Sequence, residues 1–331
     1  MNIRDIAKLA NVSVATVSRA MNQPDKVSPK TLHRINQVMQ DHHFTGNPFA
    51  RNLMNTKTHS ITLLVNSIDN RFMLDVIRGA EKTLLESGYI LSIINMTKSL
   101  EKMSSFIEFL KEKRASLFMD GLILAGSYLN ETTYYQSIKD IANCPLVVID
   151  KGPIPQVTTV YVEEERVMEQ VALSFKRKNI KRCAIISSEL EYRFSIRRCD
   201  ILQRKLREQG IEVLPEHIFS YPMEEAEHGY HAVERLLPHL PQGIYAANEP
   251  LAMGALRSLH DYGFSVPDDV SVISGENSKY CEMMIPSISS IAYANEELGI
   301  YAAKEILSAI EMPSREPQTI ILPTQFIPRE S

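Results

Sequence analysis

The chain has 331 residues, about twice the usual size of one domain, so two or more domains are expected. Its 44% hydrophobic and 23% charged residues exclude disordered, collagen-like and disulfide-scaffold proteins, and the four scattered cysteines indicate reduced thiols. The first residues lack the apolar core of a signal peptide, and no stretch approaches the roughly 18 apolar residues of a membrane span. We therefore expect a cytoplasmic protein with no membrane partner.

The net charge of −4 conceals an uneven distribution. Up to His59, eight Lys and Arg residues stand against three acidic residues, which leaves +5 on this segment and −9 on the remainder. A small basic segment joined to a large acidic one is typical of a polyanion-binding module attached to a domain with another role.

Three short helices are predicted in the first 42 residues. Their expected ranges are about 3–10, 14–21 and 29–39, and the capping residues are Asn2, Ser13 and Ser28. Two helices joined by a tight turn and followed by a packing helix are the outline of a helix-turn-helix DNA-binding domain.

The second of these helices has two unlike sides. At 100° per residue, Val17, Ala20 and Met21 share an apolar side that suits the core. The other side combines small residues, hydroxyl and amide groups and one long cation: Val14, Ala15, Ser18, Arg19 and Asn22. Small side chains allow close approach to base edges, and Arg19 can donate two hydrogen bonds to a guanine. A solvated polar face explains this helix alone as well, but its neighbours and the basic charge favour DNA contact.

A fourth, very short helix is predicted over residues 46–55, with Asn47 and Pro48 at its start. About two turns are too few to be stable alone in water, so this helix should fold only when something holds it. Leu53 on its surface is either a wedge between base pairs in the minor groove or a contact to the next domain.

The runs 3–22, 27–31 and 47–53 resemble the DNA-binding domain and hinge of the lactose/galactose repressor family, and the similarity continues more loosely past residue 60. The resemblance implies a homodimer on a near-palindromic operator, with the hinge helices ordered in the central minor groove. By position, Val14 and Ala15 match the family's specificity pair, Arg19 its guanine reader and Leu53 its intercalating leucine. Gly46 and Met54 depart from the family pattern. The candidate DNA-binding residues are Val14, Ala15, Thr16, Ser18, Arg19, Asn22, Thr31, Asn47, Ala50 and Leu53.

From residue 60, strand patterns alternate with helix patterns. Strands are predicted at 61–65, 89–94, 121–125, 146–149, 183–186, 244–247 and 270–273, and helices at 72–87, 100–114, 167–178, 196–209, 226–237 and 251–262. Strict alternation predicts doubly wound parallel sheets of the α/β class, here in two lobes. The expected domains are a helix-turn-helix head (1–45), a hinge (46–59) and a periplasmic-binding-protein-like body (60–331). We expect the N-lobe at about 60–155 plus 290–322, and the C-lobe at about 156–289 plus the tail.

Polar residues follow several predicted strands, where ligands bind in open α/β sheets. Polar residues occur directly after five of the predicted strands. A helix cap or a solvated loop explains any one of these five positions, but five of them at the same edge of the sheets favour a binding site for a small polar ligand. The resemblance implies that Phe72, Met73, Arg198, Asn248 and Glu276 match the family's effector site, although Arg71, Met73 and the run 274–277 depart from its usual residues. The candidate effector-binding residues are Phe72, Met73, Asp150, Arg193, Arg198, Asn248 and Glu276. Arg193, Arg197 and Arg198 either clamp a phosphate or carboxylate or form a solvated helix face.

Enzyme motifs are absent from the sequence: it has no glycine-rich phosphate loop after a strand, no zinc-protease pair and no nucleophile elbow. We expect no enzyme activity, no cofactor and no metal. The predicted function is a transcription regulator, most simply a repressor, that binds operator DNA and a sugar, sugar phosphate or sugar acid. A co-regulator protein as partner is left open. The alternatives are a solute-binding or sensor protein of the same lobed fold, and a metabolic enzyme that carries a DNA-binding head.

Overall fold

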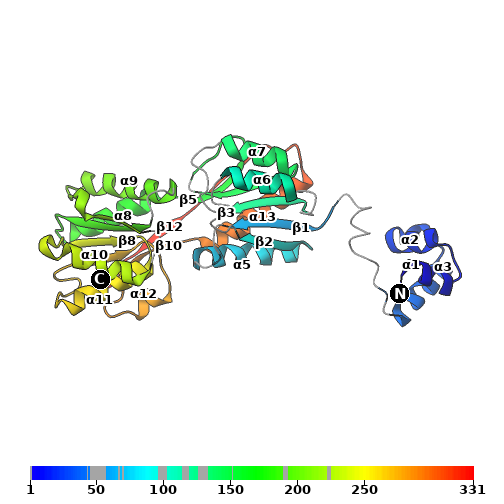
Figure 1. Cartoon of the computed structure of the whole chain (residues 1–331), viewed down its shortest axis with the longest axis horizontal. Helices are drawn as coiled ribbons and strands as arrows, with labels where there is room; N and C mark the ends of the chain where they lie inside the picture. Colours follow the sequence, from blue (N-terminus) through cyan, green and yellow to red (C-terminus); the bar gives the residue numbers. More distant parts are fainter. Residues whose placement is uncertain are drawn as a thin grey trace. The chain divides into compact units, whose positions relative to one another are not determined.

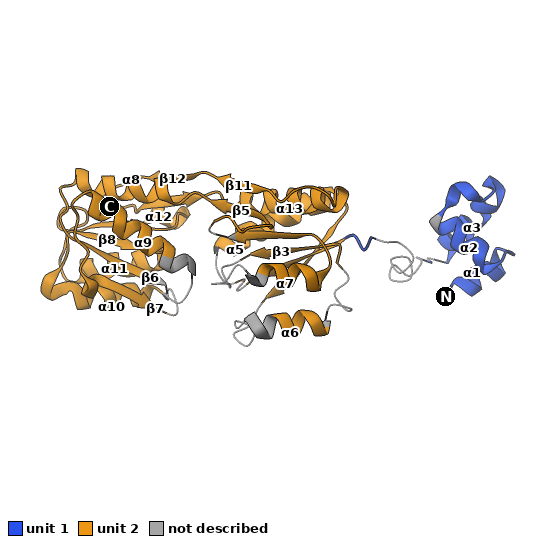
Figure 2. Cartoon of the chain, turned by 90° about the horizontal axis from the view of Figure 1, so that it is seen from above, with its two compact units in different colours: residues 1–59 blue, residues 60–331 orange. Residues whose placement is uncertain are grey.

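The computed structural model describes residues 2–42, 44, 57–65, 68, 71–95, 103–113, 119–125, 133–150, 152–188, 193–221 and 225–331. The chain divides into two compact units, residues 1–59 and 60–331, which Figure 2 colours separately. The hinge helix predicted over 46–55 lies outside the described residues. Within the described part, no helix is long and apolar enough to cross a membrane.

The first unit is a small helical domain. Its elements are α1 (Ile3–Leu9), α2 (Val14–Asn22), the 3-10 turn η1 (Pro24–Lys26) and α3 (Pro29–Asp41). Asn2 and Asp5 form a reciprocal capping box at the start of α1, and the chain turns after α1 through Asn11, whose φ is 48°. Ile6, Val17 and Ile35 form a fully buried centre, one residue from each helix. The predicted helix-turn-helix is confirmed.

The second unit contains two α/β lobes (Figure 1). The sheet of the first lobe has the order β11-β5-β4-β3-β1-β2, and all of its pairings are parallel. Its strands are β1 (Ser60–Val65), β2 (Ile90–Asn95), β3 (Gly121–Ala125), β4 (Leu146–Asp150), β5 (Thr158–Val162) and β11 (Thr319–Leu322). The strand β3 is buried along its whole length, as expected for a parallel strand that helices cover on both faces.

Two helices cover each face of this sheet. The core between the sheet and one helix pair includes Leu63, Val76 and Ile306, and the core on the other face includes Leu124 and Tyr135. The covering helices are α5 (Arg71–Glu86) with α13 (Asn295–Glu311), and α6 (Met103–Lys113) with α7 (Thr133–Ala142).

The sheet of the second lobe repeats this plan with the order β12-β10-β9-β8-β6-β7. Its strands are β6 (Cys183–Ser188), β7 (Ile218–Tyr221), β8 (Gly243–Ala246), β9 (Ser271–Ser274), β10 (Ser289–Tyr293) and β12 (Thr324–Ile327). The edge strand β12 pairs antiparallel with β10, an exception to the predicted parallel pattern. The helices and short turns of this lobe are α8 (Glu165–Arg177), α9 (Arg193–Glu208), η3 (Pro215–His217), α10 (Ala226–Leu236), η4 (Leu237–His239), α11 (Glu249–Asp261) and α12 (Lys279–Met283).

The chain crosses between the lobes three times: between β5 and α8, between β10 and α13, and between β11 and β12. The last crossing is the red segment between the lobes in Figure 1. The expected lobe boundaries near 155 and 290 need correction, because β5 still pairs with β4 in the first sheet and β10 pairs with β9 in the second. By strand and helix membership, the first lobe comprises about 60–162 and 295–322, and the second comprises 165–293 and 324–331.

Candidate functional site

The helix α2 buries one side and exposes the other. Val17 is fully buried and Ala20 nearly so. Among the predicted DNA-binding residues of this helix, Val14, Ala15 and Arg19 are exposed, and Thr16 and Ser18 are partly exposed. Val14 is 41% accessible, so the exposed side of α2 also presents a small apolar side chain, the kind of group that contacts thymine methyl groups in major-groove readers.

Hydroxyl groups position the first turns of α2 and α3. The Ser13 hydroxyl accepts a hydrogen bond from the Thr16 amide at 3.1 Å and lies 2.8 Å from the Thr16 hydroxyl. At the start of α3, the Ser28 hydroxyl donates to the Thr31 hydroxyl at 2.8 Å. Backbone amides at such helix starts, together with these hydroxyls, are suited to phosphate contact.

The side chains of four predicted DNA-binding residues lie outside the part of the chain that the structure describes. Asn47, Ala50 and Leu53 lie outside the described residues, and of Asn22 only the backbone is described, as the last residue of α2. Their roles stay predictions.

The first lobe contributes three candidate effector residues, all close to the carboxyl ends of β1 and β4. Met73 is buried in the lobe core at 1% exposure, and Phe72 is partly buried against the same core. Asp150 is the last residue of β4, and its side chain lies outside the described part.

The second lobe brings Arg198 into a buried polar cluster that we call the Arg198 cluster: Glu164, Arg198, Tyr245 and Tyr293. The Nε and Nη2 atoms of Arg198 both donate to Glu164 Oε1, at 3.0 and 2.9 Å. The Arg198 guanidinium also lies over the Tyr293 ring, 5.0 Å from its centroid. Glu164 and Arg198 are only 3% and 7% exposed, so this is a buried ion pair rather than the solvated helix face considered above.

Two tyrosine hydroxyls complete the Arg198 cluster. The hydroxyls of Tyr245 and Tyr293 are buried and have no hydrogen-bond partner among the described residues. Burial raises the pKa of both phenols, so both keep their protons and remain donors. Buried donors without a protein partner are groups that a ligand or a water molecule can satisfy.

Glu276 follows β9 and belongs to the same neighbourhood, because its charge contributes to raising the pKa values of Tyr245 and Tyr293. Its backbone is fixed by a tight turn in which the Ser274 hydroxyl donates to the Glu276 carbonyl at 2.7 Å and accepts from the Glu276 amide at 3.2 Å. Gly275 lies between them with the Tyr245 hydroxyl against it, since a Cβ there would come within 2.4 Å of that oxygen.

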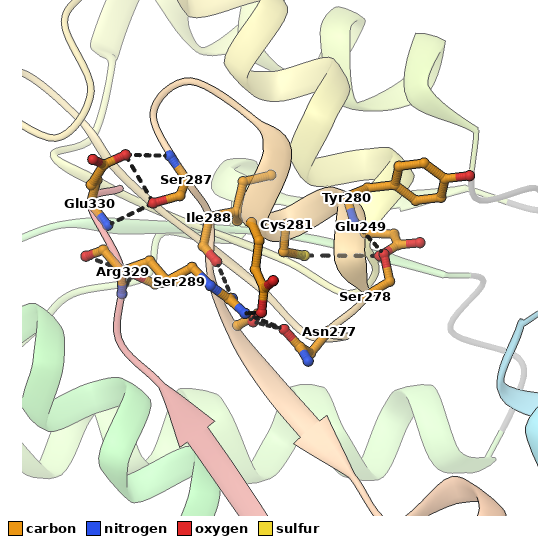
Figure 3. A network of polar contacts seen from close by, with 12 residues as sticks. Glu249, Asn277, Ser278, Tyr280, Cys281, Ser287, Ile288, Ser289, Arg329 and Glu330 are labelled. Carbon is orange, nitrogen blue, oxygen red and sulfur yellow. Dashed lines mark hydrogen bonds and ion pairs between the residues drawn. The ribbon is translucent and has the colours of Figure 1, made fainter.

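The segment after Glu276 is anchored by the chain's last strand and tail (Figure 3). Arg329 donates to Asn277 Oδ1 at 2.8 Å, to the Ile288 carbonyl at 2.7 Å and to the Ser290 hydroxyl at 2.6 Å. A single guanidinium therefore joins the start and the end of the segment 277–290, which holds Glu276 at the sheet edge.

The remaining candidates divide between structural and undetermined roles. Asn248 caps α11, and its Oδ1 accepts from the Leu251 amide at 2.9 Å, as the helix-cap interpretation expects. Arg193 begins α9, and its side chain is not described. Arg197 reaches the loop after β4 of the first lobe, because a Cβ on Gly152 would meet its Nη1 at 2.4 Å. The three arginines therefore do not form one described clamp.

Sequence reasoning missed Glu164, Tyr245 and Tyr293. Tyr245 is in an apolar strand and resembles an ordinary core residue, while Tyr293 ends a strand that was not predicted. Among the described residues, no group of three His, Cys, Asp or Glu side chains is placed to hold a metal ion.

The sequence comparisons cover both units. Residues 2–47 match the family of bacterial regulatory proteins, lacI family, and residues 172–331 match the periplasmic binding protein-like domain. The chain is 26% identical over 334 residues to the HTH-type transcriptional repressor PurR of Histophilus somni strain 129Pt, covering 99% of this chain and 98% of the relative. It is 28% identical over 333 residues to the protein of the same name from Escherichia coli O139:H28, with 99% and 96% covered.

Solved structures share the fold. The lac repressor dimer bound to operator and the anti-inducer ONPF aligns with a TM-score of 0.87 at 18% identity, over 100% of this chain and 98% of that one. The CelR regulator in complex with cellobiose aligns with a TM-score of 0.71 at 23% identity, over 100% and 99%. A LacI-family regulator from Enterococcus faecium with bound ribose aligns with a TM-score of 0.70 at 25% identity, over 82% and 98%.

Proposed function

We propose that the chain, whose residues 2–47 match the lacI family of bacterial regulatory proteins, is a transcriptional repressor that binds a near-palindromic operator as a homodimer under the control of a small polar metabolite. The observation that carries this proposal is α2: a helix with a buried apolar side and an exposed side that carries Val14, Ala15 and Arg19, inside the segment that matches the family. Action on chromosomal DNA implies the cytoplasm as its compartment. The curated relatives are named as repressors, which agrees with the expected lack of enzyme activity.

The role of α2 can be tested on an operator obtained by selection from random oligonucleotides. Arg19→Ala should weaken binding by about 1–3 kcal/mol and relax preference at one base pair in each half-site, because Arg19 supplies a two-donor contact to guanine. Lys26→Ala, an exposed cation in η1, is the matched charge control and should weaken binding to all sequences alike. Equal loss on all sequences for Arg19→Ala would show that Arg19 touches only phosphate.

We assign the hinge segment to the minor groove on the strength of the family pattern at Asn47, Ala50 and Leu53. A helix of about two turns is too short to be stable alone, so it should become ordered only when the groove holds it, and a leucine wedge bends the duplex at the cost of unstacking. Leu53→Ala should therefore reduce DNA bending, measured by the fluorescence transfer between the ends of a labelled operator, while non-specific binding stays nearly unchanged. Unchanged bending would remove the wedge.

A second copy of the chain is the proposed occupant of an exposed apolar surface on the first lobe. Leu74 and Leu85 of α5 are 48% and 58% exposed, and Ile90 and Ile93 of the edge strand β2 are 66% and 44% exposed. Ile93 shares a face of β2 with Leu91, which packs on the core beneath α5, so Leu74, Leu85 and Ile93 lie on the same side of the sheet, whereas Ile90 lies on its opposite face at the sheet edge. Large exposed apolar areas are uncommon on proteins that remain monomeric, and two half-sites require two heads.

The effector site is proposed at the carboxyl ends of the strands, where Arg198 and Glu276 lie together with the hydroxyls of Tyr245 and Tyr293. Carboxylate, guanidinium and phenol groups suit a ligand rich in hydroxyls, so a sugar, sugar phosphate or sugar acid is the proposed class. Such a ligand acts by favouring one arrangement of the lobes, and operator DNA must then change ligand affinity by the same factor.

A thermal-shift screen of sugars, sugar phosphates and sugar acids on the full chain tests this site. Glu276→Ala should abolish the shift caused by the best compound while leaving operator binding without ligand unchanged. A variant that unfolds, or that responds to the ligand as before, would contradict the assignment of Glu276. Operator titrations with and without the compound show whether it releases or recruits the repressor.

A further inference from the structure

The three crossings between the lobes are tied to one another. Glu163 donates its amide to the Leu322 carbonyl at 3.0 Å, and its own carbonyl accepts from the Thr324 hydroxyl at 2.6 Å. These bonds join the first crossing (β5 to α8) to the third (β11 to β12). They leave the second crossing (β10 to α13) to be attached by other groups.

Arg198 supplies that attachment. Its carboxylate partner Glu164 belongs to the first crossing, directly before α8, and its aromatic partner Tyr293 ends β10 at the start of the second crossing. Arg198 itself projects from α9, which belongs to neither crossing. One buried guanidinium thus bridges two crossing segments that are 129 residues apart in the sequence.

The Arg198 cluster is also where the proposed ligand would sit. The unpartnered hydroxyls of Tyr245 and Tyr293 are donors beside the guanidinium, so any group that binds them also contacts the junction of the lobes. A buried ion pair is favourable only when its geometry is good. A small shift of Glu164 or Tyr293 relative to Arg198 therefore weakens the interactions that join the two crossing segments.

We propose that Arg198 is a positioning residue for the lobe junction, which fixes the first and second crossings against each other through Glu164 and Tyr293, and through which a ligand in the effector site sets the angle between the lobes. The parts of this inference that concern the ligand and the operator rest on the proposed function. The junction itself can be measured without either.

The chain contains a matched control pair. Arg204 lies on α9 six residues after Arg198, and its Nη2 donates to both Glu165 oxygens, at 2.6 and 2.8 Å. Both pairs therefore connect α9 to the start of α8. The Arg204 pair is half exposed, however, with 47% and 49% of its side chains accessible, and within the described part of the chain the ion-pair partners of Arg204 are only glutamates of α8 and α9.

Hydrogen exchange on the full chain tests the junction. The reporters are the amides of Glu163, Met168 and Leu298, whose carbonyl partners are Leu322, Glu164 and Ala294. Arg198→Ala should raise exchange at least tenfold at all three, including Leu298 on the first-lobe side. Arg198→Lys, which keeps the charge but not the two-donor geometry, should raise it less, and Arg204→Ala should change these amides less than twofold.

Exchange that rises uniformly through β6 and β8 of the second lobe would mean that Arg198 only stabilises that lobe, and unchanged exchange at Leu298 would mean that it does not hold the second crossing. Either result overturns the proposal. If Arg198→Ala does not fold, Glu164→Gln removes the charge at nearly constant shape and should raise exchange at the same three amides.

Operator affinity provides the functional arm. Arg198→Ala should change the operator Kd of the ligand-free protein at least tenfold, in either direction, and Arg204→Ala less than twofold. An operator Kd that is unchanged in Arg198→Ala while the three amides exchange faster would show that the junction is not coupled to DNA, which also overturns the proposal. A wild-type chain that selects no operator sequence would instead contradict the proposed function, and the exchange results would still decide the role of Arg198 at the junction.

Discussion

The two lobes use the same device to pack a pair of helices, but they build it from different parts of the chain. In the first lobe, Gly79 of α5 and Gly299 of α13 bring the two backbones together: a Cβ on either would lie 2.0 Å from a carbonyl oxygen of the other helix. In the second lobe, Gly229 of α10 and Gly254 of α11 do the same, with corresponding distances of 2.0 and 1.7 Å. Only glycine permits such close crossings.

The origins of the helices differ. The helices α10 and α11 are consecutive helices joined by the short η4 and β8, whereas α5 and α13 are separated by the strands β2 to β5 of their own lobe and by most of the second lobe. The second helix pair is therefore a local unit, and the first can form only after a long-range loop closes. The same plan thus has different entropic costs in the two lobes.

The two interiors differ as well. Around its sheet, the first lobe has apolar clusters, while the second encloses the Arg198 cluster beside its apolar core. The first lobe thus carries the exposed apolar side chains of α5 and β2, and the second carries the buried polar cluster. Four experiments test or sharpen this comparison.

The largest effect is expected from the glycine crossings. Gly299→Ala and Gly254→Ala should each destabilise the protein by about 3 kcal/mol, because a methyl group must be accommodated against backbone that cannot move far. Urea unfolding of the full chain measures the change, and Glu81→Ala, on the exposed side of α5, should stay within about 0.5 kcal/mol. A decrease in the free energy of unfolding of less than about 1 kcal/mol for either variant would show that the two helices of that lobe can move apart to accommodate the methyl group with little loss of stability.

The next effect concerns assembly. Ile93→Lys should raise the dimer dissociation constant at least tenfold, about 1.4 kcal/mol, because it places a charge on the apolar surface of β2. Ile93 is 44% exposed in the single chain, so the stability of the monomer should change little. Sedimentation velocity over a range of concentrations measures the dissociation constant. An unchanged value would move the dimer contact away from the first lobe.

A smaller effect is expected in the Arg198 cluster. Tyr245→Phe should leave stability unchanged or increase it by up to about 1 kcal/mol, because the hydroxyl is buried without a partner among the described residues. The ligand-induced thermal shift should shrink at the same time. A clear loss of stability would instead show that this hydroxyl makes a structural hydrogen bond, and would weaken the contrast between the lobes.

The smallest effect is a pH dependence on the surface of the second lobe. His231 Nδ1 lies 2.6 Å from Glu234, and this hydrogen bond raises the pKa of His231 above its usual value near 6.5. The folded state therefore binds the proton more tightly than the unfolded state. The stabilisation is fully present below about pH 6.5 and is lost as the pH rises through the folded pKa. The Tm difference between wild type and His231→Ala should shrink from pH 6 to pH 8, and a constant difference would contradict this.

The local origin of the second lobe's helix pair explains why sequence patterns predicted it. The expected helices at 226–237 and 251–262 agree closely with α10 and α11. By contrast, α7, α13 and the strands β5, β7, β10, β11 and β12 were not predicted. The edge strands β11 and β12 have only four residues each with mixed burial, so neither alternation nor a continuous apolar run marks them. The lobe to which a strand belongs is also decided by its pairing with strands far away in the sequence, and local sequence periodicity carries no information about that pairing.

The candidate site was predicted in the same uneven way. Residues that follow a predicted strand, such as Glu276 and Arg198, were found from topology and family pattern. Their partners Glu164 and Tyr293 were not, because they lie at crossings whose positions depend on how the sheets assemble. Met73 was singled out by the family pattern, and the structure places it in the core.

The long separation between α5 and α13 has a consequence for synthesis on the ribosome. Residues 1–59 emerge first and contain all their core partners, so the helical head can fold at once. Most of the second lobe is complete once β10 has emerged, but the first lobe still lacks α13 and β11 at that moment. The nascent chain must therefore carry an unfinished amino-terminal half while the middle folds, and during that interval the apolar strands of the first sheet are the part most exposed to chaperones and to aggregation.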